Sequence, residues 1–462
     1  MKRIFLFVLL LSACSSGPDF RRPAAPSMKS WDSQGVVVGK RLQEQWWKLF
    51  SSPEIDGLVK SAMRGNQDLE AARQSVAQAA EEVRIAEAGE MPQVGIGAAT
   101  GRQKYGVALF GPSNFAIPPF TYYEVGPFAS WSPDLSGGLR RSIELRKAQQ
   151  RYLAHQLDAA WVVLTGNVVM EAIGISFGKE ERKIASSIVL SDLKALSLAE
   201  ASYEEGASSR MEVLAASEDL EEDKKRIPQI MDSISSGSHS LSILLGKTPE
   251  EAPAVPDFSR ISLPARIPAG LPSELVRMRP DILASEEDLH AASAAIGIAD
   301  SRLYPSLTLT ANLMQEALTP AGIFRSVASA WSLAAQIAAP VYDAGSIDAQ
   351  RNQAKHAYLA SLARYRQTIL HAFGEVEDAL SAVSRDEDQI RILSARLSDA
   401  QERLGIEGAR RDAGSEGEIG LEAARRRLLE ARLALMDEER VRLQDAVRLF
   451  VALGGSPLEK MH

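Results

Sequence analysis

Polar and apolar residues alternate without a break in SLTLTANL, the stretch from Ser306 to Leu313. Successive side chains of a β-strand point to opposite faces of a sheet, so this pattern predicts a strand with one apolar and one polar face. A run of about ten alternating residues also suits a strand that crosses a membrane, with lipid on one side and water on the other. The alternative is a half-buried strand of a soluble sheet.

Three other stretches share this period of two. In Trp331 to Ala339 the apolar positions are Trp331, Leu333, Ala335, Ile337 and Ala339. Earlier in the chain the apolar positions are Val94, Ile96 and Ala98, and then Tyr123, Val125, Ala129 and Trp131. We therefore predict two β-hairpins, at about residues 93–132 and 306–341, with aromatic residues near the strand ends, where a membrane meets water.

The two hairpins belong to an internal duplication. Gly206 returns as Gly414, about 208 residues later, and Pro133 returns as Pro340. A unit this long is not a solenoid repeat of about 20 to 50 residues, so it indicates a duplicated half-protein. We expect six segments in chain order: a signal peptide (1–13), a lipidated N-terminal linker (14–52), a first repeat (53–250), a Pro-rich linker (251–272), a second repeat (273–455) and a short tail (456–462).

Very long helical stretches flank the predicted strands, and Pro228 inside one of them should kink or break it. Apolar residues at heptad spacing form a stripe that must pack on another helix. One such stripe comprises Val189, Leu193, Leu196 and Tyr203. The helices alone fit a soluble coiled coil, but the strands do not, so the predicted fold class is mainly α with a membrane β-barrel part, built from a duplicated helix–strand–strand–helix unit.

One chain supplies four predicted strands, which are too few to close a membrane barrel. An open sheet edge in lipid leaves backbone groups unpaired, so a membrane sheet must close on itself. Closed barrels begin at about eight strands. The chain must therefore oligomerise.

The N-terminus predicts export and lipidation. A short basic start precedes an apolar run from Ile4 to Leu11, which is typical of a signal peptide. The tetrapeptide LSAC, which ends at Cys14, resembles a bacterial lipoprotein box, and the resemblance implies that Cys14 becomes a lipidated N-terminus. Ser15, in place of aspartate, favours sorting to the outer membrane by the same resemblance.

Composition excludes several classes of function. The net charge is −8, and an acidic chain is a poor partner for nucleic acid, which binds basic surfaces. None of the six histidines has a metal-ligand spacing, so we expect no metal, no catalytic residue and no cofactor apart from the lipid on Cys14. No run of about 18 apolar residues follows the N-terminus, so we expect no spanning helix. We interpret the basic run Arg425 to Arg427 as surface charge that pairs with nearby glutamates; the alternative is a role in a gate.

The family resemblance is carried mainly by RPDILASE, which begins at Arg279, and ADSRLYPSL, which begins at Ala299. Both strongly resemble the TolC-like outer-membrane efflux protein family, in particular its lipoprotein branch, which serves RND-type tripartite pumps. WWKLF, which begins at Trp46, fits the same family. The resemblance covers essentially the whole mature chain.

This resemblance implies a homotrimer, anchored by lipid in the bacterial outer membrane and extending into the periplasm. Its 12-stranded β-barrel would continue as a 12-helix periplasmic α-barrel. The implied partners are a periplasmic adaptor protein, an inner-membrane pump of the RND type and outer-membrane lipid. The implied function is a passive exit duct for drugs or other small compounds. The alternatives are the channel of a one-step (type I) protein secretion system, a periplasmic adaptor lipoprotein, and an enzyme with an unrecognised site.

The resemblance also places a gate at the helix turns around Gly206 and Gly414. In the lipoprotein branch an acidic ring falls two residues after the second glycine, which implies Glu416 here, with Glu418 and Glu422 as neighbours. Carboxylates that converge in a pore attract cations and focus the electrostatic potential. The alternative for Glu416 is a solvated first-turn residue favoured by the helix dipole.

Overall fold

The structure, a computed structural model, describes residues 16–28, 30–31, 36–38, 45–104, 118–264, 267–269, 272–413 and 417–455. The chain folds as two compact units. The sheet unit contains the described residues within Met1–Pro23, Ser75–Leu153 and Ala284–Tyr365. The hairpin unit contains those within Ala24–Gln74, Ala154–Leu283 and Arg366–His462.

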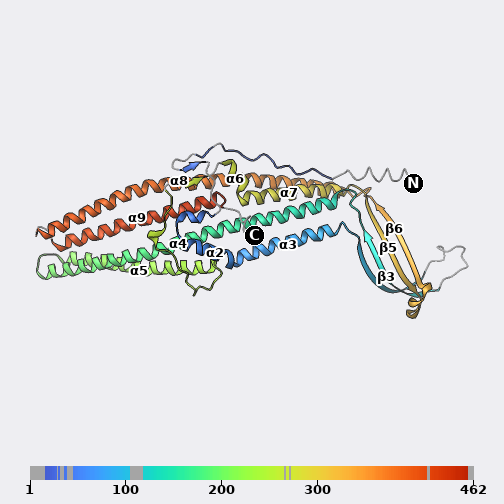
Figure 1. Cartoon of the computed structure of the whole chain (residues 1–462), viewed down its shortest axis with the longest axis horizontal. Coiled ribbons are helices and arrows are strands. Elements are labelled where there is room, and N and C mark those ends of the chain that lie inside the picture. The colour runs from blue at the N-terminus through green and yellow to red at the C-terminus, as the bar shows by residue number, and fades with distance from the viewer. Residues whose placement is uncertain are drawn as a thin grey trace. The chain divides into compact units, whose positions relative to one another are not determined.

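Four antiparallel strands form the sheet of the sheet unit, in the order β2-β3-β5-β6. Their bounds are Gln93–Gln103 for β2, Phe120–Trp131 for β3, Ser306–Ala317 for β5 and Ser329–Ala338 for β6. All four predicted strands are therefore present (Figure 1). The two short 3₁₀ helices between β5 and β6 are η4 (Pro320–Phe324) and η5 (Ser326–Ala328), whereas residues 105–117, between β2 and β3, lie outside the described residues.

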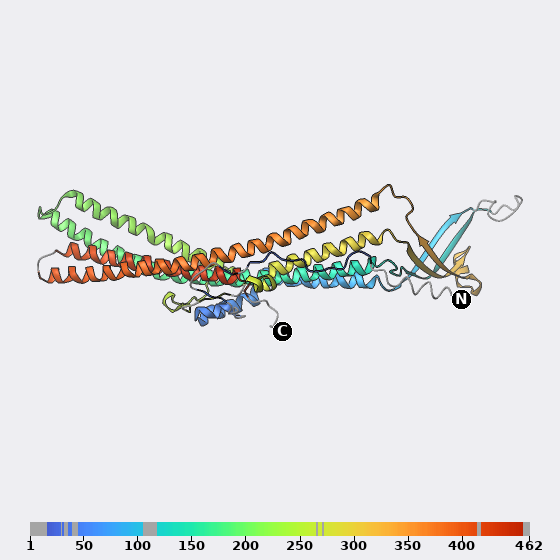
Figure 2. The same ribbon diagram turned by 90° about the horizontal axis from the view of Figure 1, so that it is seen from above.

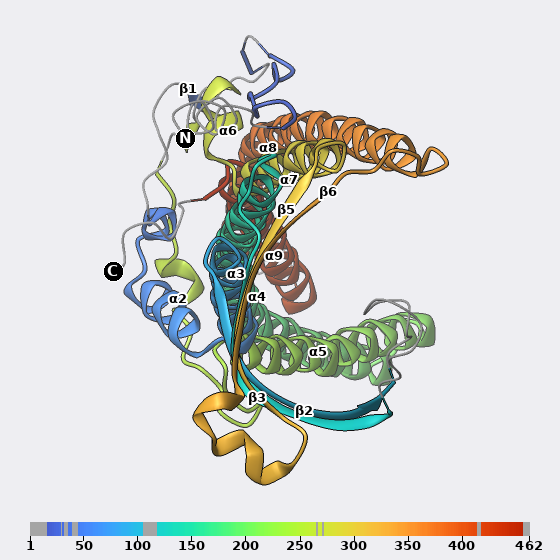
Figure 3. The ribbon, with the colours of Figure 1, turned by 90° about the vertical axis from the view of Figure 1, so that its right-hand side faces the viewer.

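The register of the sheet places the predicted apolar residues of neighbouring strands side by side. Ile96 faces Pro127, Ala129 faces Ala311, and Leu313 faces Trp331. Directly paired residues of antiparallel strands point to the same side, so one face of the sheet collects the apolar positions. Figure 3 shows that the strands bend together into a curved wall.

Long helices continue from both ends of each β-hairpin. They are α3 (Gln67–Ala88), α4 (Gly138–Glu204), α7 (Pro280–Ser301) and α8 (Ser346–Asp412). The α4 and α8 helices each contribute their first part to the sheet unit and the rest to the hairpin unit. Three glycines inside α4, Gly166, Gly174 and Gly178, do not interrupt it.

The hairpin unit pairs α4 with α5 (Arg210–Leu244) and α8 with α9 (Glu418–Ala452), as Figure 2 shows. It also contains η1 (Trp46–Phe50), α2 (Pro53–Gly65), η3 (Phe258–Arg260) and α6 (Pro272–Met278). The rings of Trp46 and Phe450 lie 5.3 Å apart in a fully buried aromatic cluster with Phe50. Arg279 of the RPDILASE motif donates to the carbonyl oxygen of Ala452 at 2.8 Å, so this part of the motif holds the end of α9.

Two three-residue strands were not predicted. Strand β1 (Val36–Val38) pairs in parallel with β4 (Ile267–Ala269). Both lie in segments that we expected to be linkers. Each is too short for a periodic pattern, and their pairing joins positions far apart in the sequence.

Of the kink or break predicted at Pro228, the break is wrong, because α5 is continuous through this residue. The proline lies on the exposed side of α5, whereas Leu220, Ile230 and Leu241 are buried. Water can therefore satisfy the carbonyl that loses its helical hydrogen bond. Packing of the buried side holds the helix together across this position.

Within one chain, the apolar stripe predicted for α4 is only partly buried. Leu193 and Tyr203 are 43% and 44% exposed, whereas Ile188, Asp192 and Ala199 are buried. The core position of α4 at this level is thus held by an acid, which an apolar pattern cannot reveal.

The α4 helix also contains an 18-residue window with a mean hydropathy of 1.5, which makes it long and apolar enough to cross a membrane by composition alone. It is the single such helix in the part of the chain that the structure describes. Because 67% of that window is buried inside the structure, it has the character of a core helix. Interspersed polar residues explain why no uninterrupted apolar run marked it in the sequence.

Candidate channel wall and gate

The two faces of the sheet differ in chemistry. On one face Ile96, Leu333 and Ile337 are 78%, 75% and 72% exposed. The opposite face carries polar side chains, and there Asn312 donates to the hydroxyl of Ser332 at 3.2 Å. A continuous exposed apolar face marks a surface that is covered by lipid or protein, and here a polar face lies behind it. This arrangement suits a wall with lipid on one side and water on the other.

Aromatic side chains mark both ends of this wall. Trp131, Tyr304 and Tyr342 are exposed near the ends of the strands that join the helices, whereas Trp331 lies toward the other end of β6. The indole N–H of Trp131 donates to the carbonyl of Glu90 at 2.9 Å. An apolar ring with one satisfied polar group is the type of side chain that prefers a membrane–water interface.

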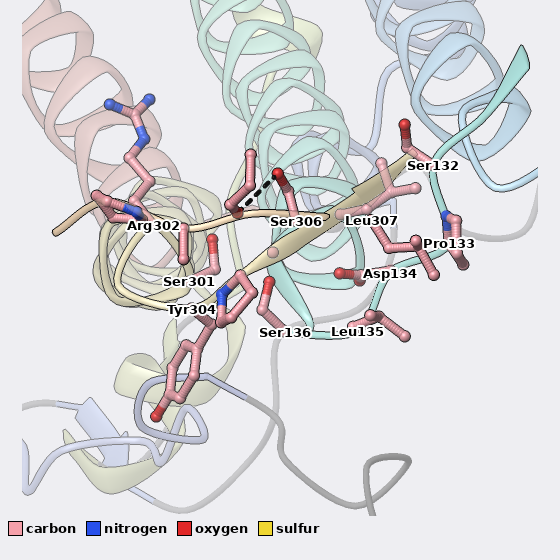
Figure 4. A pocket seen from close by; sticks show the side chains of 16 residues that line it. Ser132, Pro133, Asp134, Leu135, Ser136, Ser301, Arg302, Tyr304, Ser306 and Leu307 are labelled. Carbon is pink, nitrogen blue, oxygen red and sulfur yellow. Dashed lines mark hydrogen bonds between the residues drawn. The ribbon is translucent and has the colours of Figure 1, made fainter. Parts of the chain in front are cut away.

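A cavity of about 640 Å³ opens where the strands join the helices (Figure 4). Ser306 donates to the carbonyl of Ala338 across it at 3.4 Å. Its charged lining residues are already engaged, because Asp134 accepts from the backbone N–H of Arg140 at 2.9 Å and Arg302 pairs with Gln350. The rest of the described lining is mainly apolar, with proline, leucine and alanine side chains beside a few serine hydroxyls.

The first helix turn is built by Gly206 and Ser209. Gly206 has a φ of +71°, a left-handed conformation that glycine adopts freely, and it ends α4. The N–H of Ala207 then donates to the carbonyl of Ser202 at 2.8 Å. Ser209 caps α5 by accepting a hydrogen bond from the N–H of Glu212. The predicted turn around Gly206 is therefore a tight, capped helix–helix connection.

At the second turn, Glu416 lies outside the described residues, and so does Cys14 at the N-terminus. Glu418 is half-exposed and pairs with Lys194 of α4 at 3.2 Å. Glu422 is 1% exposed and accepts from Lys194 at 2.9 Å and from Ser191 at 2.9 Å. Burial alone would raise the pKa of Glu422, but the hydrogen bonds from Lys194 and Ser191, with the charge of Arg425, lower it below its ordinary value. Within one chain, Glu422 thus ties α9 to α4.

One turn further along α9, Arg426 is the centre of a larger cluster, which we call the arginine clamp. Its guanidinium contacts Asp219 at 2.7 Å, Asp223 at 2.8 Å and Asp192 at 3.6 Å. These acids come from α5 and α4, so a single side chain of α9 links three helices. Burial raises the pKa of Asp192 to about 6, and repulsion by Asp223 adds to this, whereas the charge of Arg426 opposes it.

The sequence predicted Arg425 to Arg427 as surface charges that pair with nearby glutamates. Arg425 pairs with Glu422 at 3.0 Å and Arg426 pairs with Glu430 at 3.2 Å, as predicted. Arg426 also lies against buried aspartates of two other helices, which was not predicted. The spacing of Asp219 and Asp223, one helical turn apart, was the available signal for a shared partner. The partner itself depends on how the helices pack, so the sequence could not name it.

A second buried acid lies in α8. Asp386 is 5% exposed, and its Oδ2 atom has no hydrogen-bond partner among the described residues. Burial raises the pKa of Asp386 to about 6, with repulsion by Asp445 and Glu438 and opposition from Arg385 and Arg442. The folded-state pKa thus lies above the ordinary value of 3.8, so this carboxyl stabilises the fold in its neutral form.

We expect the stability contributed by Asp386 to be present below about pH 4 and lost as the pH rises through about 6. Asp386→Asn removes this titration. The unfolding free energy of the variant, relative to the wild type, should therefore be higher at about pH 8 than at about pH 4.5. Urea unfolding of both detergent-solubilised proteins at the two pH values measures the difference. An equal difference at both would contradict the role given to Asp386.

Comparison with known proteins places this geometry in a family. A sequence model described as outer membrane efflux protein matches residues 58–247 and 271–455. The pyoverdine export outer membrane protein OpmQ of Pseudomonas aeruginosa is 31% identical over 459 residues, covering 97% of this chain and 95% of OpmQ. The cation efflux system protein CusC of Escherichia coli K12 is 27% identical over 460 residues, covering 98% of each protein.

A solved structure of the outer-membrane channel OprN matches the fold with a TM-score of 0.85 at 27% identity, over 96% of this chain and 99% of OprN. The outer membrane channel CmeC of Campylobacter jejuni matches with a TM-score of 0.87 at 22% identity, which shows the same fold. OprN and CmeC are outer-membrane channels, and the similarity to them runs through both the strands and the long helices. The chain belongs to the outer membrane efflux protein family.

Proposed function

We propose that three copies of this chain form the outer-membrane channel of a tripartite efflux system and act as a passive exit duct for small compounds. The observation that carries the proposal is the two-faced sheet with open edges. Each copy would add four strands to a 12-stranded barrel and its long helices to a periplasmic tube. A periplasmic adaptor protein and an inner-membrane pump of the RND type would complete the system.

The edges of the sheet support assembly with identical copies. Strands β2 and β6 each pair on one side only within the described sheet. Both carry large exposed apolar side chains, such as Val94 on β2 and Trp331 on β6. In lipid the free backbone groups of such edges must find partners. Pairing β2 of one copy with β6 of the next satisfies both edges and keeps the apolar face on the outside.

The relatives support a duct with little selectivity of its own. Their names refer to pyoverdine, cations, solvents and toluene, which differ widely in size and charge. A common channel architecture that serves such different compounds cannot depend on one specific binding site. We therefore assign the choice of substrate to the pump and adaptor.

The helix turns are the surfaces that we propose for the adaptor. Met211, in the first turn of α5, is 72% exposed, and Ile419, in the first turn of α9, is 46% exposed. The two positions follow the two duplicated turns, so each copy offers two similar apolar contacts. Exposed apolar side chains at a solvent-facing turn favour a protein partner.

The arginine clamp bears on how the duct would open. It joins α4, α5 and α9 of one chain, so these helices move together at this level. Opening would then separate neighbouring chains, or the ends of the hairpins beyond Glu418. The contacts of the arginine clamp within each chain would be kept. Glu416 precedes Glu418 by two residues in the sequence, so the proposed carboxylate ring would belong to that terminal region.

We expect Glu416→Lys to change the single-channel conductance and to lower the cation selectivity of the channel in planar bilayers, because it reverses three converging charges. Glu250→Lys, in the exposed segment after α5, is the matched control, since it changes the net charge equally. Unchanged conductance and selectivity for Glu416→Lys would refute the ring. Absence of any discrete conductance steps from the wild-type protein would refute the channel itself.

A further inference from the structure

The first described residues, Ser16 to Arg22, are bound to the helices of the sheet unit. Arg141 of α4 is the centre of the contact and is only 5% exposed. Its Nε atom donates to the carbonyl of Ser16 at 2.9 Å, and its Nη2 atom donates to the carbonyl of Gly17 at 3.3 Å and to Asp19 at 2.8 Å. Ser16 is itself 4% exposed, and its hydroxyl donates to the carbonyl of Ser136. The guanidinium thus recognises main-chain carbonyls of this segment.

Two glycines allow the segment to cross α7 at contact distance. Gly17 has a φ of +77°, and a Cβ atom built there would lie 2.4 Å from the Cα of Gly297. A Cβ atom on Gly297 would lie 2.7 Å from both the carbonyl oxygen of Ser16 and the Cγ of Arg141. A side chain at Gly17 or at Gly297 would clash, so the segment fits against α7 because both positions are glycine.

The contact continues along the segment. The ring of Phe20 stacks on the ring of His290 at 4.2 Å with an interplanar angle of 9°. His290 is held by Glu144, whose Oε1 lies 2.8 Å from its Nε2. Arg22 then pairs with Glu286 at 2.6 Å. The main-chain carbonyls, the ring of Phe20 and the guanidinium of Arg22 therefore each contact a side chain of α4 or α7.

We propose that these residues form a binding site for the peptide that directly follows Cys14, and that the site fixes the point at which the lipid anchor leaves the protein. We call it the anchor-docking site, made of Arg141, Glu286, His290 and Gly297. Cys14 precedes Ser16 by two residues, so their Cα atoms lie within about 7 Å of each other. Ser16 lies against Ser136. Ser136, which is labelled in Figure 4, is in the turn between β3 and α4.

The acyl chains would therefore leave the protein near the ends of the strands that join the helices, where Trp131 and Tyr304 lie. That consequence rests on the proposed lipidation of Cys14, whereas the docking rests on the contacts alone. The docking does not depend on channel activity, so the absence of conductance would not contradict it.

Trypsin cleavage after Arg21 tests the site, because that bond is cut when the segment leaves the helices. The protein is the full lipidated chain in detergent or nanodiscs, and release of the peptide that ends at Arg21 is followed by mass spectrometry. We expect Arg141→Ala to speed release by about tenfold or more, since it removes several charge-assisted hydrogen bonds. Arg140→Ala, at the exposed neighbouring position, is the matched control and should leave the rate unchanged.

A second pair of variants excludes a general loss of folding. Gly297→Ala should release the segment although alanine favours the helix, whereas Gly374→Ala, whose Cβ meets nothing within 4 Å, should not. A Cys14→Ser chain, which has no lipid, should keep the protection if the site acts as proposed. Equal cleavage of Arg141→Ala and the wild type would overturn the proposal. Loss of protection in the Cys14→Ser chain would overturn it too, because the membrane would then be holding the segment.

Discussion

Leu333→Arg is expected to remove most of the folded oligomer from the outer membrane. Leu333 lies in the middle of β6, opposite Ala311 and 75% exposed on the apolar face. If that face meets lipid, an arginine there costs about 2–4 kcal/mol near the bilayer midplane, in every copy of the barrel. The measurement is the fraction of protein recovered as folded oligomer from purified outer membranes.

The neighbouring residue supplies the control for this experiment. Ala334 is also exposed, but it points to the opposite, polar face of the sheet. Ala334→Arg adds the same charge on the side proposed to face water, so it should assemble like the wild type. Equal recovery of both variants, or loss of Ala334→Arg alone, would show that the faces have been assigned wrongly.

Arg426→Ala is expected to lower the free energy of unfolding by about 3 kcal/mol. Removing one partner of a buried ion pair leaves the other charge uncompensated, which typically costs about 3–5 kcal/mol. Here Asp192 and Asp223 stay buried without their shared cation, and the partial exposure of Arg426 places the effect at the low end. Urea unfolding of the detergent-solubilised protein, followed by circular dichroism, measures the change.

The pH and a neighbouring arginine test the cause of this loss. Because Asp192 has a pKa of about 6, it binds a proton in mild acid, and the loss caused by Arg426→Ala should shrink there. Arg427→Ala, on the exposed side of α9, should change the unfolding free energy by less than about 0.5 kcal/mol. A large effect of Arg427→Ala, or an effect of Arg426→Ala that is constant with pH, would contradict the clamp.

The sheet could be predicted from sequence because its information is local. Alternation at Leu307, Leu309 and Leu313 reports two faces without knowledge of any partner strand. Strands β1 and β4 could not be predicted, since three residues carry no period and their pairing is decided by the rest of the fold. Pro228 was misjudged for a similar reason, because its effect depends on which side of α5 faces water.

The functional residues divide in the same way. Glu416 and Cys14 were predicted from a resemblance, and both remain predictions. Glu422 was predicted beside the pore, and the structure adds that within one chain it is buried against α4. The clamp of Arg426 and the docking of Ser16 onto Arg141 join segments far apart in the sequence. Polar contacts of this kind leave no periodic trace, so only the packed structure reveals them.

We propose that one chain supplies only part of a membrane wall and that identical copies close it around water. Native mass spectrometry of the complex extracted from outer membranes by detergent decides whether this is so. We expect a mass of three chains with their lipids. A single water-soluble chain, with its four alternating strands folded in a compact core, would contradict it.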